Sequence, residues 1–223
     1  MKEMDRNVLS AAFHVTIPVL MGYLAIGMAF GLMMDSAGYN VFWALLMSLI
    51  IYAGAGQYMG VTLLAAGASP LQTALMTLLL NFRHMFYGLS MLEKFRGMGL
   101  RKLYMIFSLT DETYALLASA KAPEGVREKD YYLAIALMDH SYWVLGTVLG
   151  SLLGSALSFD TTGVDFAMTA LFIVIAVGQW KGTRNHLPAA IGCLATLASL
   201  RLAGEDNMLI LALVVIVAAL LVF

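Results

Sequence analysis

The sequence predicts an all-α integral membrane protein, a bundle of about seven or eight transmembrane helices, some broken or re-entrant. Of its 223 residues, 61% are apolar and only 12% are charged, whereas a soluble domain is about half apolar and a quarter charged. The apolar residues also fall in long runs that short polar connections separate. Because so few ionisable groups could not cover this much apolar surface in water, we expect lipid to be the solvent.

Eight apolar runs approach the length of about 20 residues that a membrane-spanning helix needs. The first lacks a small-residue cleavage site, so we interpret it as a retained span rather than a signal peptide. The connections are too short for an appended soluble domain, and we expect one transmembrane transport domain over residues 1–223. The predicted spans are 12–34, 41–66, 70–92, 104–120, 131–157, 164–181, 187–203 and 207–223.

A short internal similarity suggests that the domain has two related halves, 12–120 and 131–223. Residues 56–60 (GQYMG) and 178–182 (GQWKG) each end an apolar run. Two related halves are common among secondary transporters. Five-residue matches also arise by chance in a glycine-rich membrane chain, so both interpretations stay open, and parallel or inverted halves are equally compatible with the pattern.

The basic residues predict the orientation, because cytoplasmic connections are enriched in Lys and Arg. Lys2 and Arg6 place the N-terminus in the cytoplasm, and the basic connection 121–130 lies there too. The connection 93–102 disagrees, since counting eight crossings puts it outside although it is strongly basic. Either the charge rule fails locally or a neighbouring segment is re-entrant, and we favour a re-entrant segment. Its basic residues are Lys94, Arg96, Arg101 and Lys102.

Two polar clusters interrupt the third and fourth runs. An ionisable group costs about 2.5–3.5 kcal/mol at the bilayer centre, so such groups face protein or water. Asn81 and His84 share one helix face, and we expect Arg83 to pair with Asp111, with Glu112 beside it. These charges either line a pathway for a zwitterionic substrate or form a fixed strut between two helices.

Small residues interrupt the second run at Gly54 and Gly56. A helix break there would free backbone N–H groups that can hold a carboxylate. The alternative is a packing face, because Gly56 and Gly60 have the GxxxG spacing. Gln57 favours a functional interpretation, since a primary amide in lipid needs partners. The sequence thus predicts helix breaks at 54–57, 81–84 and 110–113.

Asp139 and His140 near the start of the fifth run are candidates for proton coupling, since imidazole titrates close to neutral pH. The alternative is that the pair lies at a wet membrane end. The ladder of Gly146, Gly150 and Gly154 indicates a close helix contact. A single cysteine, Cys193, leaves no thiolate metal cage, so we expect no metal and no cofactor, and the net charge of −1 argues against nucleic acid as a partner.

Three segments together resemble the AzlC-type branched-chain amino acid permeases of bacteria. They are residues 53–57 (AGAGQ), 81–87 (NFRHMFY) and 110–115 (TDETYA). Trp143, Gly146-Thr147, Gly150 and residues 164–167 (VDFA) are similar as well. The resemblance implies the large subunit of a two-component exporter of valine, leucine and isoleucine, with methionine as a further candidate. It also implies a small AzlD-type membrane subunit as partner, protons as coupling ion and the bacterial inner membrane as location.

The sequence therefore predicts a proton-coupled exporter whose pathway includes Gly54, Gly56, Gln57, Asn81, Arg83, His84, Asp111 and Glu112. One alternative is an intramembrane enzyme in which Ser90, Ser108 or Ser141 pairs with His84 or His140, although neither Gly-x-Ser-x-Gly nor HExxH occurs. A channel or a non-transporting assembly subunit is the other alternative.

Overall fold

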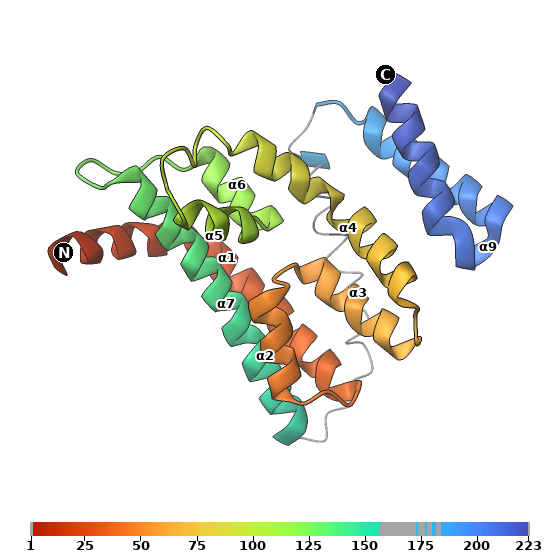
Figure 1. The fold of residues 1–223 in the computed structure, drawn as a ribbon, viewed down its shortest axis with the longest axis horizontal. Helices are drawn as coiled ribbons and strands as arrows, with labels where there is room; N and C mark the ends of the chain where they lie inside the picture. Colours follow the sequence, from red (N-terminus) through yellow and green to blue (C-terminus); the bar gives the residue numbers. More distant parts are fainter. Residues whose placement is uncertain (1, 157–172, 174–176, 178–179, 182–183, 223) are drawn as a thin grey trace. The chain divides into compact units, whose positions relative to one another are not determined.

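The computed structural model describes residues 2–156, 173, 177, 180–181 and 184–222 (Figure 1). It divides into two compact units, Met1–Met168 and Thr169–Phe223. Every regular element of the described residues is a helix, which confirms the all-α class. Three of these helical segments are long and apolar enough to cross a membrane: Asn7–Ser36, Glu128–Ala156 and Leu187–Gly204. The predicted count of seven or eight crossings is not confirmed.

The core of the first unit is the contact between α1 (Lys2–Ser36) and α7 (Glu128–Ala156), which lie side by side (Figure 1). The two helices are parallel, since Gly27 lies against Trp143 and Gly31 against Thr147. A Cβ on Gly31 would overlap the Thr147 carbonyl. The close helix contact predicted from the glycine ladder is therefore confirmed, and residues without a side chain are what permit it.

The predicted span 41–66 is a hairpin of two short helices, α2 (Val41–Ile50) and α3 (Gly54–Ala65). At 1.5 Å per residue, neither helix reaches across the roughly 30 Å of a bilayer core. The chain turns between them so that α3 faces α2, because a Cβ on Gly60 would lie 3.3 Å from Cε of Met47. Tyr52, between the two helices, has a φ of 41°, a left-handed conformation that is strained for a bulky residue.

Helix α4 (Pro70–Ser90) is continuous through its 21 residues. Ser69 caps it by accepting a hydrogen bond from the backbone N–H of Gln72, and Pro70 suits the first helical turn. The break predicted at Asn81–His84 is wrong, because polar side chains interrupt the hydropathy of a helix without interrupting its backbone hydrogen bonds. Its length of about 30 Å matches a bilayer core, but it is not one of the three described helical segments that are long and apolar enough to cross a membrane.

The predicted span 104–120 is a second hairpin, of α5 (Arg101–Phe107) and α6 (Asp111–Ser119). Arg101, where the hairpin begins, pairs with Asp130 in the first turn of α7 at 2.8 Å. Where the hairpin ends, the Ala120 carbonyl accepts a hydrogen bond from Tyr132 at 3.3 Å. Both ends therefore lie beside the start of α7, so this segment returns to the side from which it came.

The second hairpin explains the disputed connection 93–102. Lys129 Nζ donates to the Gly97 carbonyl at 3.1 Å, which places this connection beside the connection 121–130. The segment after this connection is broken into two short helices, as expected, and its re-entry into the membrane stays a prediction. The segments 41–66 and 104–120 are each two short helices rather than one continuous span, and the prediction that they cross completely is not confirmed.

The second unit contains α9 (Leu187–Val222), in which the backbone leaves helical geometry at Gly204 (φ 72°, ψ 178°). This kink falls in the predicted connection between spans 187–203 and 207–223. The predicted span 164–181 lies largely outside the described residues, as do Asp165 and most of the second GQWKG-type segment. The internal repeat and the two halves therefore stay a prediction.

Candidate functional site

The tips of the two hairpins meet at His140 of α7. Tyr52, at the first tip, and Phe107, at the second, have ring centroids 6.2 Å apart. The imidazole of His140 stacks on Tyr52 with centroids 4.0 Å apart. Its Nε2 lies 3.0 Å from the Ser48 carbonyl and its Nδ1 3.0 Å from the Tyr104 hydroxyl. Because a carbonyl only accepts, Nε2 carries a proton and Nδ1 can accept from Tyr104.

Asp139 is fully buried, so the interpretation of this pair as lying at a wet membrane end is wrong. Helix α7 begins at Glu128, which places Asp139 about 17 Å along it. Its Oδ2 accepts a hydrogen bond of 2.8 Å from Thr113. Its Oδ1 is buried without a hydrogen-bond partner among the described residues. A buried, half-satisfied carboxyl at this depth is costly, which marks it as a functional candidate.

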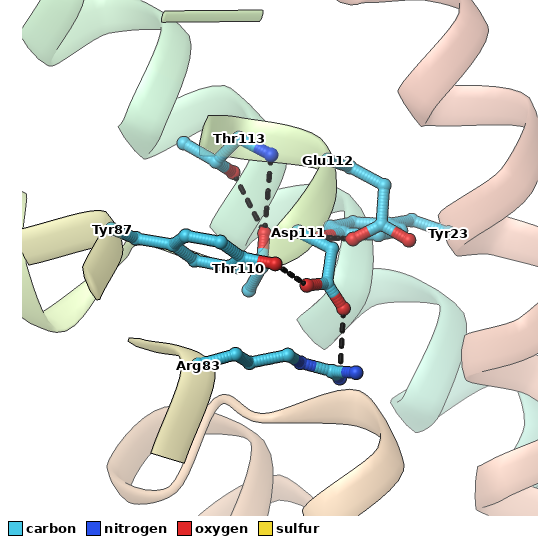
Figure 2. A network of polar contacts seen from close by, with 7 residues as sticks. All are labelled: Tyr23, Arg83, Tyr87, Thr110, Asp111, Glu112 and Thr113. Carbon is cyan, nitrogen blue, oxygen red and sulfur yellow. Dashed lines mark hydrogen bonds and ion pairs between the residues drawn. The ribbon is translucent and has the colours of Figure 1, made fainter. Parts of the chain in front are cut away.

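A series of hydroxyl groups connects Asp139 to Glu112, and Figure 2 shows the part from Thr113 to Glu112. Thr113 contacts Thr110 at 3.0 Å, and the Thr110 hydroxyl lies 2.6 Å from that of Tyr23 in α1. Tyr23 in turn lies 2.8 Å from Glu112 Oε2. The three hydroxyl-bearing residues are buried, and Glu112 is half-buried. Three helices, α1, α6 and α7, thus contribute to one continuous polar path.

Arg83 and Asp111 form the predicted ion pair, with Nη2 and Oδ2 2.8 Å apart (Figure 2). Their side chains are 27% and 20% exposed, so the pair is accessible from one side while most of it is enclosed. The hydroxyl of Tyr87 donates to the other carboxylate oxygen of Asp111 at 2.7 Å. The pairing is confirmed, and whether these charges bind substrate stays a prediction.

Gln57 is fully buried and has found protein partners for its amide. Its Oε1 accepts from the indole N–H of Trp143 at 2.9 Å, and its Nε2 donates to the Ser48 hydroxyl at 3.1 Å. Ser48 then donates to Thr147 at 3.0 Å. These bonds link the first hairpin to α7 through Gln57. The amide therefore has a structural role, whereas the sequence placed it in the pathway.

Gly54 and Gly56 begin α3, as the predicted half-helix requires. A Cβ on Gly54 would lie 3.1 Å from the Trp143 ring, and one on Gly56 would lie 3.2 Å from Nδ2 of Asn81. The cap residue Ala53 has no side chain that could satisfy the first N–H groups of the helix, which leaves donors of positive partial charge near Asn81. His84 lies on the other side, beside the charged residues, with its ring 5.7 Å from that of Tyr87, which bonds Asp111.

The structure thus separates the predicted residues into two neighbouring groups. Arg83, Asp111 and Glu112 gather at the start of α6, where Glu112 connects to Asp139. The second group lies at the start of α3 and consists of Gly54, Gly56, Gln57 and Asn81. His84 is next to Tyr87. The sequence analysis missed Tyr23, Tyr52 and Tyr104, whose signal was a phenol group inside an apolar run, which needs a partner when buried.

The serines of the enzyme hypothesis donate to main-chain carbonyls. Ser90 bonds the Tyr87 carbonyl at 2.9 Å, Ser108 that of Met105 at 3.3 Å and Ser141 that of Met138 at 2.7 Å. The pairing of one of these serines with His84 or His140 is not formed in the described part of the chain. A groove of about 560 Å³ lies at the basic end and is lined by Leu9, Arg101 and Arg127 among others.

These features define a helical membrane protein in which two helical hairpins surround a charged and hydroxyl-rich site. The model of the AzlC protein family matches residues 18–157. An uncharacterized membrane protein of Helicobacter pylori is 47% identical over 212 residues, which cover 95% of this chain and 93% of the relative. The chain belongs to the AzlC family.

Two named relatives add to this comparison. The branched-chain amino acid transport protein AzlC of Bacillus subtilis is 39% identical, over 95% of this chain and 84% of its own length. The inner membrane protein YgaZ of Escherichia coli is 33% identical, over 81% of this chain and 77% of its own length. No solved structure matches the chain.

Proposed function

We propose that this chain is a secondary transporter that exports branched-chain amino acids across the bacterial inner membrane. The substrates are L-valine, L-leucine and L-isoleucine, with L-methionine as a further candidate. The observation that carries the proposal is the ion pair of Arg83 and Asp111 beside Glu112, placed where the two hairpins turn. The name of the Bacillus subtilis relative supports the substrate class.

A zwitterionic amino acid needs complementary charges within a few ångströms of each other, and this cluster has them. Arg83 offers a guanidinium for the substrate carboxylate, and the uncapped start of α3 offers backbone N–H donors nearby. Asp111 and Glu112 offer acceptors for the ammonium group. An amino acid that enters between Arg83 and Asp111 exchanges their mutual pairing for its own two charges, so the buried charge stays balanced.

Export requires an energy source, and Asp139 with His140 is our proposed site of proton coupling. Both lie on α7 where the hairpin tips meet, and both are buried. No phosphate-binding Gly-rich loop is present in the sequence, which favours an ion gradient over nucleotide hydrolysis. A small AzlD-type membrane subunit completes the transporter in this proposal.

The N-terminus lies in the cytoplasm in this proposal. The starts of α1 and α7 share one end of the first unit, and the basic connections 93–102 and 121–130 meet at that end. Cytoplasmic connections carry the excess of Lys and Arg. One orientation therefore agrees with all of these connections.

The test is uptake of radiolabelled L-valine into liposomes that hold an excess of unlabelled L-valine. We expect counterflow when the chain is reconstituted with its small subunit, competed by leucine and isoleucine but not by lysine or aspartate. Arg83→Gln should abolish counterflow, whereas the matched control Arg96→Gln, an arginine 81% exposed in the connection 93–102, should keep it. Equal counterflow in both variants would overturn the proposal, as would competition by lysine.

A further inference from the structure

The hydroxyl series between Asp139 and Glu112 contains one hydrogen bond more than it has hydroxyl protons. Four contacts join five oxygens in a row, at 2.8, 3.0, 2.6 and 2.8 Å. Each contact needs one proton between its two oxygens. Thr113, Thr110 and Tyr23 bring one hydroxyl proton each. With both carboxylates ionised, the 2.6 Å contact of Thr110 with Tyr23 would join two lone pairs.

We infer that Asp139 and Glu112 share a single proton, which the three hydroxyls relay between them. With the proton on Glu112, each oxygen donates to the next in the direction of Asp139. With the proton on Asp139, the same four hydrogen bonds all run in the opposite direction. The structure shows the first direction at the threonine pair, where Thr110 donates to Thr113. The second direction requires the Thr113 side chain to rotate before its hydroxyl can donate to Thr110.

The transfer is balanced in protons. When the Asp139 O–H bond breaks, its proton passes to Thr113, and the hydroxyl proton of Thr113 passes to Thr110. The proton of Thr110 then passes to Tyr23, and that of Tyr23 forms the new O–H bond on Glu112. The three hydroxyls end with one proton each, and the net change is one proton moved from Asp139 to Glu112.

The charges around the relay favour one shared proton over two ionised carboxylates. Neither Asp139 nor Glu112 has an ion pair with a Lys or Arg among the described residues, and the nearby Arg83 is engaged by Asp111. Two unpaired carboxylates in a buried site would repel each other without compensation. The other titratable groups that face the relay are Tyr52 between α2 and α3, Tyr104 on α5 and His140 on α7.

The relay gives the proposed exporter its route for the coupled proton, and this step rests on the proposed function. Glu112 is half-buried beside Arg83 and Asp111, whereas Asp139 is fully buried. The relay therefore connects the substrate cluster with the interior of α7. Because Tyr23 comes from α1 and the threonines from α6, a shift between these helices would open the relay.

The proton itself is counted without any transport assay, by infrared spectroscopy of the purified protein in lipid nanodiscs. A protonated carboxyl has its own C=O band, separate from that of a carboxylate. We expect the wild type to show one such band from this pair. Glu112→Gln and Asp139→Asn should each remove it completely, because the amide N–H₂ group replaces the shared proton as the terminal donor. A band that survives in either variant, or is absent from the wild type, would overturn the inference.

Two further measurements keep the test decisive if a variant does not fold. Carboxyl ¹³C labelling of aspartate and then of glutamate in the wild type should shift complementary fractions of one band. Fractions that sum to two carboxyls would contradict sharing. Thr113→Val should abolish valine transport driven by a pH gradient and preserve valine exchange at equal pH, while the matched variant Thr113→Ser should retain both. If the wild-type protein shows no valine exchange, the proposed function is rejected, but the number of protons on the two carboxyls is unaffected.

Discussion

Arg83 Nη2 lies 2.8 Å from Asp111 Oδ2, and this ion pair joins the long helix α4 to the first turn of the short helix α6. Tyr87, one turn further along α4, donates to the same carboxylate at 2.7 Å. The negative charge of Asp111 also lies at a helix N-terminus, where the helix dipole favours it. The pair is therefore both a link between helices and an accessible charge in the interior, so strut and pathway are compatible roles.

Neutralising Asp111 should weaken the fold and abolish transport. Asp111→Asn leaves the guanidinium of Arg83 without its counter-charge, at a cost of about 1.5–3 kcal/mol for a hydrogen bond between charged groups. Exchanging the two residues (Arg83→Asp with Asp111→Arg) should restore the melting temperature in nanodiscs but not valine efflux. Efflux at the wild-type level in either variant would reduce the pair to a strut.

The contact of α1 with α7 should tolerate no side chain at Gly31. Its Cβ would overlap the Thr147 carbonyl, which is main chain and cannot move aside. We expect Gly31→Ala to destabilise the protein by at least about 2 kcal/mol, the scale of overpacking. The control is Gly22→Ala on the same helix, where a Cβ meets nothing within 4 Å. Thermal unfolding in detergent compares the two, and equal midpoints would refute the parallel packing described above.

The hairpins predict which side of the membrane each connection faces. In a Cys193→Ser background, Arg96→Cys should react with a membrane-impermeant thiol reagent only from the cytoplasm. Ala66→Cys, at the end of α3, should react only from outside. Gly97 is unsuitable for this test, because its φ is 74° and a Cβ would lie 2.7 Å from Lys129 Nζ. Labelling of Ala66→Cys from the cytoplasm would show that the first hairpin is a complete crossing.

Lys94 should hold the end of the second hairpin in place. Its ammonium donates to the carbonyls of Leu117 and Ala120 and lies 4.5 Å from the centre of the Tyr132 ring. Lys94→Met removes these bonds and should cost about 1–3 kcal/mol, seen as a lower midpoint of thermal unfolding. Arg96→Met in the same turn, where the side chain is exposed, should leave the midpoint unchanged. An equal loss in both would assign the effect to net charge.

Residues whose chemistry conflicts with lipid were predictable from the sequence. Arg83 and Asp111 carry opposite charges in neighbouring apolar runs, so their pairing followed from the cost of leaving either alone. The glycine ladder in α7 predicted a close helix contact, because small residues at this spacing are enriched where membrane helices pack against each other. The predicted breaks at Gly54 and Thr110 lie at the starts of α3 and α6, where the structure interrupts both segments.

The rest depended on three-dimensional proximity that periodicity does not encode. Hydropathy counts only how apolar a run is, so two short helices in a hairpin looked like one span. Tyr23 appeared as one aromatic residue among many, yet its hydroxyl closes the path between Thr110 and Glu112. Asp139 lay close to the predicted start of its span, and only the packing of both hairpin tips around α7 buries it.

The central claim is that an amino acid binds where the hairpins turn, and substrate protection tests it most directly. Asn81→Cys, beside the start of α3, is labelled with a small thiol reagent in the Cys193→Ser background. We predict that L-valine slows this labelling several-fold, that L-lysine does not, and that Arg96→Cys reacts equally fast with and without valine. Labelling of Asn81→Cys that valine leaves unchanged, in a variant that still transports valine, would contradict the account.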